Sequence, residues 1–282
     1  MAHDFPNLPV RVLPSSSIKR LGHLSSSDIR TRFRRDGALL FRGFSPSIEE
    51  FKAFTAQFCQ YFIAYPGSKR GRVNDETNVQ TVDMDKAGIP FHSELSYSPV
   101  RPDLAWFFCV VPPRRGSATI LCDGIALAEA LPSNMREWLE KRKLRFKAEL
   151  GRRTWQRLFG CVTIPQVKEM IRQRSYANVI VAGDKVHIDH LTAPLAPTKY
   201  DTRVAFCNNL ILHRGKASAV PFADGSILCD ELYEQLVRVS ERLTIEIAWK
   251  AGDLLMVDNT RMMHGRRPVL DDDRLIWTRF GS

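Results

Sequence analysis

Short apolar segments typical of β-strands recur along most of this chain, and one long stretch of helical character interrupts them. Each strand-like segment is rich in β-branched or aromatic residues, and turn-forming residues separate it from the next. The segments are 38–44 (ALLFRGF), 103–111 (DLAWFFCVV), 118–124 (ATILCDG), 178–183 (NVIVAG), 185–189 (KVHID), 203–209 (RVAFCNN), 243–249 (LTIEIAW), 253–259 (DLLMVDN) and 274–280 (RLIWTRF). Many short strands framing one helical insertion predict an α+β protein with a jelly-roll (double-stranded β-helix) core and helices outside it.

Two helices are predicted before the first long strands. The segment 25–37 opens with serines, of which Ser26 or Ser27 could cap a helix that Gly37 ends. The segment 47–62 carries three phenylalanines at helical spacing, so we expect that face of the helix to lie in the core.

The helical insertion covers about residues 126–176 and includes the basic run EWLEKRKLRFKAEL at 137–150. We expect one domain over residues 1–282, because β-sandwiches and barrels of roughly 200–250 residues commonly fold as a single unit. The polar loop at 63–90 is long for a plain connection, and long loops in compact domains often cover sites.

Composition narrows the class of protein. The six cysteines are scattered without a CxxC pair, which argues against a zinc ribbon or a secreted disulfide scaffold. The N-terminal segment lacks the apolar run of roughly 7–15 residues that a signal peptide needs. No window approaches the roughly 18 uninterrupted apolar residues of a membrane span. We therefore expect a soluble, cytoplasmic protein.

The charge of the chain is unusually basic. Its 41 Lys and Arg residues against 31 Asp and Glu give a formal net charge of +10, and residues 136–174 alone hold twelve basic and four acidic side chains. This segment is either a solvated helical face or a docking patch for an acidic partner. A nucleic-acid-binding β-sandwich is a distant alternative, because the segment lacks the alternating aromatic and basic residues of a single-strand binding surface.

One short motif has the form of a metal site. Residues i and i+2 of a strand point the same way, so His92-Ser93-Glu94 can offer an imidazole and a carboxylate to one ion. Two histidines and one carboxylate on one face of the metal are what a non-haem iron(II) oxygenase needs. His187-Ile188-Asp189 has the same spacing and lies in a better-defined strand candidate, so spacing alone does not choose between the two.

Longer motifs give the choice a context. The segment PFHSELSYSPVRPDLAWFFCVVPPRRGSAT at 90–119 resembles the ligand motif of the taurine dioxygenase-like (TauD/TfdA) oxygenases. The segment AGDLLMVDNTRMMHGRRPVLDDDRLIWTRFG at 251–281 resembles their second motif, and GALLFRGF at 37–44 their N-terminal strand. Three further segments, at 154–160, 203–209 and 222–228, are similar to a subgroup that includes amino-acid hydroxylases of nonribosomal peptide assembly lines.

This resemblance implies a set of metal ligands. Carried onto this sequence, it makes His92, Glu94 and His264 the ligands of Fe(II), while the rival motif falls on an ordinary strand. It also implies that Asp258 and Asn259 position the turn that carries His264.

The resemblance further implies 2-oxoglutarate as cosubstrate and O2 as oxidant. Arginine suits the far carboxylate of 2-oxoglutarate, because its planar fork matches carboxylate geometry. The family pattern places that arginine at Arg274, with the Thr119 hydroxyl on the same carboxylate. Arg279 is a fallback for this role, a binder of a substrate acid group, or a packing residue; in a regular strand it would point away from Arg274. Asn78 and Gln80 are implied to line the pocket.

The implied activity is hydroxylation of a small substrate. A carboxylate at position 94 favours hydroxylation, desaturation or a related oxidation over halogenation, because related halogenases leave that position without one. The subgroup suggests an amino acid or a similar small metabolite, free or attached to an acidic carrier protein. Desaturation and a carrier-bound substrate remain alternatives.

Overall fold

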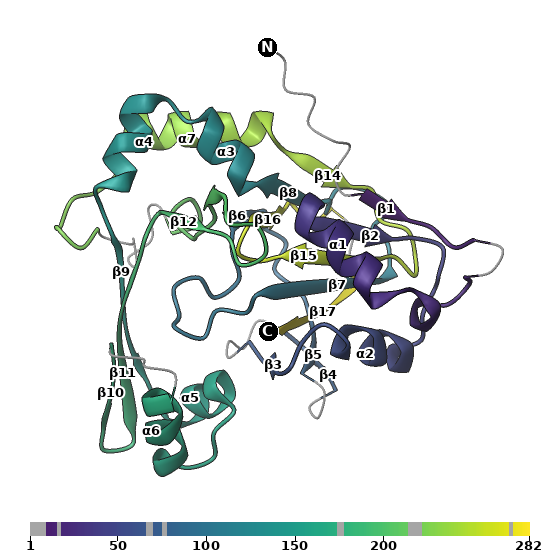
Figure 1. Cartoon of the computed structure of the whole chain (residues 1–282), viewed down its shortest axis with the longest axis horizontal. Helices are drawn as coiled ribbons and strands as arrows, with labels where there is room; N and C mark the ends of the chain where they lie inside the picture. Colours follow the sequence, from purple (N-terminus) through teal and green to yellow (C-terminus); the bar gives the residue numbers. More distant parts are fainter. Residues whose placement is uncertain are drawn as a thin grey trace.

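Two β-sheets pack face to face, and helices and a projecting arm surround them (Figure 1). The computed structural model describes residues 10–15, 18–65, 70–74, 78–173, 178–213, 222–270 and 273–282. Within these ranges no helix is both long enough and apolar enough to cross a membrane.

The larger sheet has the strand order β1-β2-β15-β7-β17-β5-β4, with β3 beside β17. Strands β1 and β2 pair in parallel, and the other pairs are antiparallel. The strands are β1 (Val10–Val12), β2 (Ala38–Phe41), β3 (Phe62–Ile63), β4 (Arg72–Asn74), β5 (Val79–Thr81), β7 (Leu104–Val111), β15 (Leu254–Asp258) and β17 (Leu275–Gly281).

The smaller sheet has four antiparallel strands in the order β14-β8-β16-β6. They are β14 (Ile245–Ile247), β8 (Thr119–Asp123), β16 (Met262–Arg266) and β6 (Ile89–His92). Strand β16 therefore has a neighbour on each side, and it runs through the middle of the sheet.

Helices cover the outer face of each sheet. An apolar cluster joins α1 (Ser26–Asp36), α2 (Ile48–Ala56) and the short 3-10 helix at Leu21–His23 to the larger sheet. A second cluster joins α3 (Gly124–Ala130), α4 (Ser133–Glu140) and α7 (Asp230–Arg242) to the smaller one. A short hairpin of β12 (Leu195–Pro197) and β13 (Val204–Phe206) completes this side.

Residues 144–192 include an arm that extends away from the two sheets (Figure 1). Three antiparallel strands build it in the order β10-β11-β9, and two helices pack beside them. These elements are β9 (Leu144–Leu150), α5 (Arg152–Phe159), α6 (Ile164–Gln173), β10 (Val179–Ala182) and β11 (Lys185–Thr192).

The space between the two sheets forms a third core. Alternation along the strands sends every second side chain into this space, and buried apolar residues of β7, β8, β15, β16 and β17 fill much of it. The ring of Phe107 on β7 lies 5.2 Å from the ring of His264 on β16, which places that histidine on the inner face.

The jelly-roll prediction is confirmed by these two sheets. The insertion is not wholly helical, however, because residues 144–150 form β9, where pairing with β11 overrides a sequence of good helix formers.

Two elements of the structure, helix α7 and strand β16, were not predicted from the sequence. The cap of the first helix is Ser25 and not Ser26 or Ser27 as expected, since the Ser25 hydroxyl accepts from the Asp28 amide. Positions 66–69, 75–77 and 174–176 lie outside the described residues.

Gly265 marks a close approach between β16 and β6. A Cβ at this position would lie 2.5 Å from the Ile89 carbonyl oxygen and 3.1 Å from the Ile120 side chain. We expect Gly265→Ala to lower the free energy of unfolding by about 1–3 kcal/mol, since a backbone atom has no easy way to move aside. Gly151→Ala is the control, because a Cβ there meets nothing within 4 Å. Urea unfolding measures both, and equal losses would contradict the close approach.

Candidate active site

Two histidines and one glutamate from distant parts of the chain meet between the sheets. His92 ends β6, Glu94 follows two residues later, and His264 is paired with His92 across β6 and β16. All three are buried, and a nitrogen or oxygen from each lies within 4.8 Å of the others. His264 Nε2 is 3.9 Å from Glu94 Oε2.

The orientation of His92 leaves one ring nitrogen for the cluster. Its Nδ1 lies 2.9 Å from the Pro90 carbonyl oxygen, and an N–H on this atom leaves the Nε2 lone pair free. Burial, followed by the nearby His264, lowers the pKa of His92 to about 3. The imidazole is therefore neutral at physiological pH, which is the form that binds metals.

Glu94 is ionised although it is buried. Burial acts to raise the pKa of its carboxyl group, but the Arg70 guanidinium and the two imidazoles outweigh that effect, so the pKa lies below its usual range. Arg70 Nη2 donates to Glu94 Oε2 at 2.7 Å.

The side chain of Asn259 holds the segment that carries Glu94. Its Oδ1 accepts from the Glu94 amide at 2.8 Å and from the Ser93 hydroxyl at 3.1 Å. Its Nδ2 donates to the carbonyl oxygens of Glu94 and Pro102 at 2.9 and 2.7 Å. Leu95, immediately after, has a φ of 52°, so the chain turns sharply where these bonds hold it.

Asp258, the residue before Asn259, acts on a different turn. Its Oδ1 accepts from the amide and hydroxyl of Thr260, which shapes the turn into β16, and burial raises its pKa to about 6. Asp258 and Asn259 were both expected to position the turn that carries His264. Asp258 makes contacts of this kind, whereas the side chain of Asn259 holds the segment that carries Glu94.

The donor set fits Fe(II). A buried carboxylate and two imidazoles with ligand atoms within 4.8 Å of one another match the two-histidine, one-carboxylate pattern that leaves other coordination positions open. Among the described residues, this is the one group of three or more His, Cys, Asp or Glu side chains that lie close enough together to hold a metal ion.

A cationic group lies elsewhere in the inter-sheet space. Arg274 is 8% exposed, its Nε is buried without a hydrogen-bond partner, and no described carboxylate forms an ion pair with it. Burial, followed by the charge of Arg266, lowers its pKa to about 10.

Thr119 lies opposite Arg266 on the neighbouring strand, since the two residues are register partners in the β8–β16 pair. The Thr119 hydroxyl accepts from Trp249 Nε1 at 3.0 Å, so its own proton is available to an acceptor. Such a place suits the far carboxylate of 2-oxoglutarate.

Arg279 is held in a different place. Its Nη1 donates to the Lys52 carbonyl oxygen and the Thr55 hydroxyl of α2, at 3.0 and 2.6 Å, and its guanidinium lies 3.3 Å from the Phe62 ring centroid. These contacts are on the outer face of the larger sheet, so they favour packing among the three alternatives for this residue.

The rival motif lies in the arm. Asp189 is paired with Arg145 at 2.5 Å, and His187 is 43% exposed, 3.7 Å from Glu149. Neither side chain joins the cluster of His92.

Asn78 and Gln80 make local contacts to the backbone. Asn78 Nδ2 donates to the Phe62 carbonyl oxygen, and Gln80 bonds both the amide and the carbonyl oxygen of Tyr65. Sequence reasoning missed Arg70, which lies beside Glu94, and Tyr65, whose ring lies against the Arg70 guanidinium; the only signal was their place in the long polar loop.

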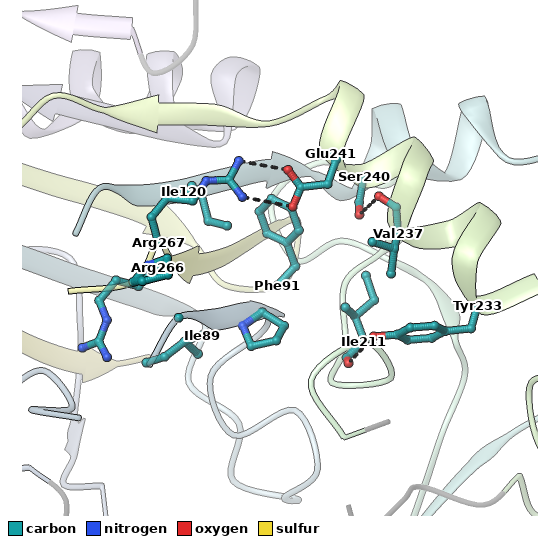
Figure 2. A pocket seen from close by; sticks show the side chains of 13 residues that line it. Ile89, Phe91, Ile120, Ile211, Tyr233, Val237, Ser240, Glu241, Arg266 and Arg267 are labelled. Carbon is teal, nitrogen blue, oxygen red and sulfur yellow. Dashed lines mark hydrogen bonds and ion pairs between the residues drawn. The ribbon is translucent and has the colours of Figure 1, made fainter. Parts of the chain in front are cut away.

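A cavity of about 310 Å³ lies on the other face of the smaller sheet, toward α7 (Figure 2). Phe91 and Ile120 line it, and the ion pair of Arg267 with Glu241 lies at its edge. None of the three cluster residues lines this cavity.

Comparison with known proteins agrees with this geometry. The family model of the taurine catabolism dioxygenase TauD, TfdA family matches residues 14–279. A clavaminate synthase-like protein of Arabidopsis thaliana is 24% identical over 93% of this chain and 86% of its own. The structure is similar to a taurine dioxygenase from Burkholderia xenovorans, with a TM-score of 0.64, 15% identity, and 96% and 85% of the two chains covered. It is also similar to PvcB of Pseudomonas aeruginosa, with a TM-score of 0.60, 17% identity, and 96% and 84% covered.

The chain belongs to the TauD, TfdA family, since the match covers most of its length. It is accordingly a dioxygenase that uses Fe(II) and 2-oxoglutarate.

The bonds of Asn259 lead to a first prediction for the site. We expect Asn259→Ala to weaken the binding of Co(II), a probe for Fe(II), by more than about tenfold, because the Glu94 amide and carbonyl lose their partners. Asn208→Ala is the matched control, since Asn208 is equally buried but bonds Leu210 and Pro194. Equal losses of Co(II) affinity in a titration would show that Asn259 contributes only general stability.

Proposed function

We propose that this member of the TauD, TfdA family hydroxylates an unactivated C–H bond of an amino acid or a related small metabolite, with His92, Glu94 and His264 as its iron ligands. The observation that carries this proposal is the convergence of these three buried side chains between the sheets. When bound, the iron with 2-oxoglutarate and O2 supplies the oxidising power, and 2-oxoglutarate is converted to succinate and CO2.

The protein's own groups hold and orient the reactants. His92 is fixed as a neutral ligand by the Pro90 carbonyl, and Glu94 is fixed by Asn259. Arg274 and Thr119 bind the far carboxylate of 2-oxoglutarate, which gives the buried guanidinium the partner that it lacks. The apolar core around Phe107 keeps water from this end of the site.

Relatives support a role in secondary metabolism. PvcB is an Fe, alpha-ketoglutarate dependent oxygenase from an isonitrile synthetic pathway. Desaturation or another oxidation that starts from the same C–H bond is the alternative outcome for this chain. A substrate carried by an acidic protein is compatible with the exposed Arg152, Arg153 and Arg157 of α5.

The proposed ligand set is tested by removing imidazoles. We expect His92→Ala and His264→Ala each to lower Co(II) affinity by at least about tenfold and to abolish iron-dependent succinate formation from 2-oxoglutarate. His187→Ala is the matched control, because that histidine belongs to a motif of the same spacing in the arm. The proposal fails if all three variants bind the metal as tightly as the natural protein.

The cosubstrate site is tested by comparing two arginines. Hydrogen bonds to charged groups contribute about 1.5–3 kcal/mol each, so Arg274→Gln should weaken 2-oxoglutarate binding by at least about tenfold. Arg279→Gln should lower stability through its lost contacts to α2 and leave the Kd of 2-oxoglutarate within about twofold. Calorimetry on the Co(II)-loaded proteins measures both constants. A larger effect at Arg279 would assign the cosubstrate to that residue.

A further inference from the structure

Arg70 presents a fixed positive charge beside Glu94. Its side chain is 11% exposed, and Nη2 donates to Glu94 Oε2 at 2.7 Å. The guanidinium carbon lies 4.4 Å from the centroid of the Tyr65 ring and 4.9 Å from that of Phe280. Two aromatic rings and one carboxylate therefore position this group.

One end of the guanidinium has no partner. Nη1 is buried and makes no hydrogen bond. It shares its carbon with Nη2, so it lies within a few ångströms of the Glu94 carboxylate by covalent geometry. Leaving a buried donor of a charged group unsatisfied costs about 1–3 kcal/mol or more, and an acceptor from a ligand would remove that cost.

Hydrogen bonds hold the backbone of Tyr65 beside Arg70. Gln80 holds the backbone of Tyr65 through two hydrogen bonds, at 2.7 and 3.2 Å, which fixes the ring against the guanidinium. Tyr97 is also close, and burial, followed by the nearby Tyr65 and Glu94, raises its pKa well above the usual range. The Tyr97 hydroxyl therefore stays protonated, and its side chain is hydrogen-bonded to that of Tyr65.

Arg70 differs from the arginine assigned to the cosubstrate. The groups whose charge acts on the pKa of Arg274 are Arg266 and Cys109. Arg70 has other neighbours, since its charge acts to lower the pKa values of Glu94, His92 and Tyr97. The protein thus has two separate buried cations, of which Arg70 is the one that contacts Glu94. A divalent ion bound by Glu94 would offset the charge of that carboxylate, so the buried Arg70 guanidinium would then be able to pair with a second anion.

We propose that Arg70 binds a carboxylate of the substrate through Nη1, and so selects small molecules that carry a free acid group. This inference rests on the proposed function, because it takes Glu94 as a ligand of the iron. Its position beside Glu94 places the acid group next to the metal, so the carbons oxidised are those close to that group. An amino acid with a free carboxylate meets this requirement, whereas one linked to a carrier through its only carboxyl group does not.

The test compares acids with their uncharged amides. The protein is loaded with Mn(II) and N-oxalylglycine, an unreactive analogue of 2-oxoglutarate, and loading is measured first. The twenty protein L-amino acids and their primary carboxamides are then titrated by calorimetry. We expect at least one acid to bind, and to bind at least about tenfold more tightly than its amide, since a charge-assisted hydrogen bond is lost.

Variants connect this preference to Arg70. Arg70→Gln should abolish the preference for the acid, and Arg70→Lys should retain part of it, because lysine keeps the charge but not the fork. Arg145→Gln is the control for the loss of one positive charge, since Arg145 is paired with Asp189 in the arm.

The outcomes separate the two proposals. Failure of the natural protein to bind Mn(II) and N-oxalylglycine would contradict the proposed function itself. In loaded protein, equal binding of acids and amides, binding of no acid, or an unchanged preference in Arg70→Gln would overturn the role of Arg70. The comparison of acid with amide needs no variant, so it decides the question even if Arg70→Gln does not fold.

Discussion

The site depends on one amide side chain that spans two distant parts of the sequence. Asn259 follows the last residue of β15, and its four hydrogen bonds reach the backbone and side chain of residues 93–94 and the carbonyl of Pro102. These groups are buried, so each would lack water if its partner were lost. The geometry of Glu94 is therefore set by the larger sheet, although the histidines come from the smaller one.

The two sheets divide the work of building the centre. The smaller sheet contributes His92 and His264 as neighbours across one strand pair, a register that fixes the spacing of their rings at 4.4 Å. The larger sheet contributes the anchor for Glu94 and, just before β17, Arg274. Because both sheets are packed through the same inner core, the parts are positioned by the fold and not by a flexible loop.

Much of this arrangement could be predicted from the sequence. Strand-like segments and turns indicated the jelly roll, and the long motifs around His92 and His264 selected the cluster that the structure brings together. The strand β9 was missed because its residues favour helix and only pairing with β11 makes them extended. Arg70 could not be found, since its role comes from contacts with Tyr65, Glu94 and Phe280 that no local pattern records.

Arg266, two residues after His264, donates to the backbone carbonyls of Asp83, Asp85 and Ala87. Backbone carbonyls are the same whatever side chain follows them, so this anchor imposes little on the identity of residues 83–87. Other side chains at these positions would leave the three hydrogen bonds unchanged, so the loop would stay attached to the strand that carries His264.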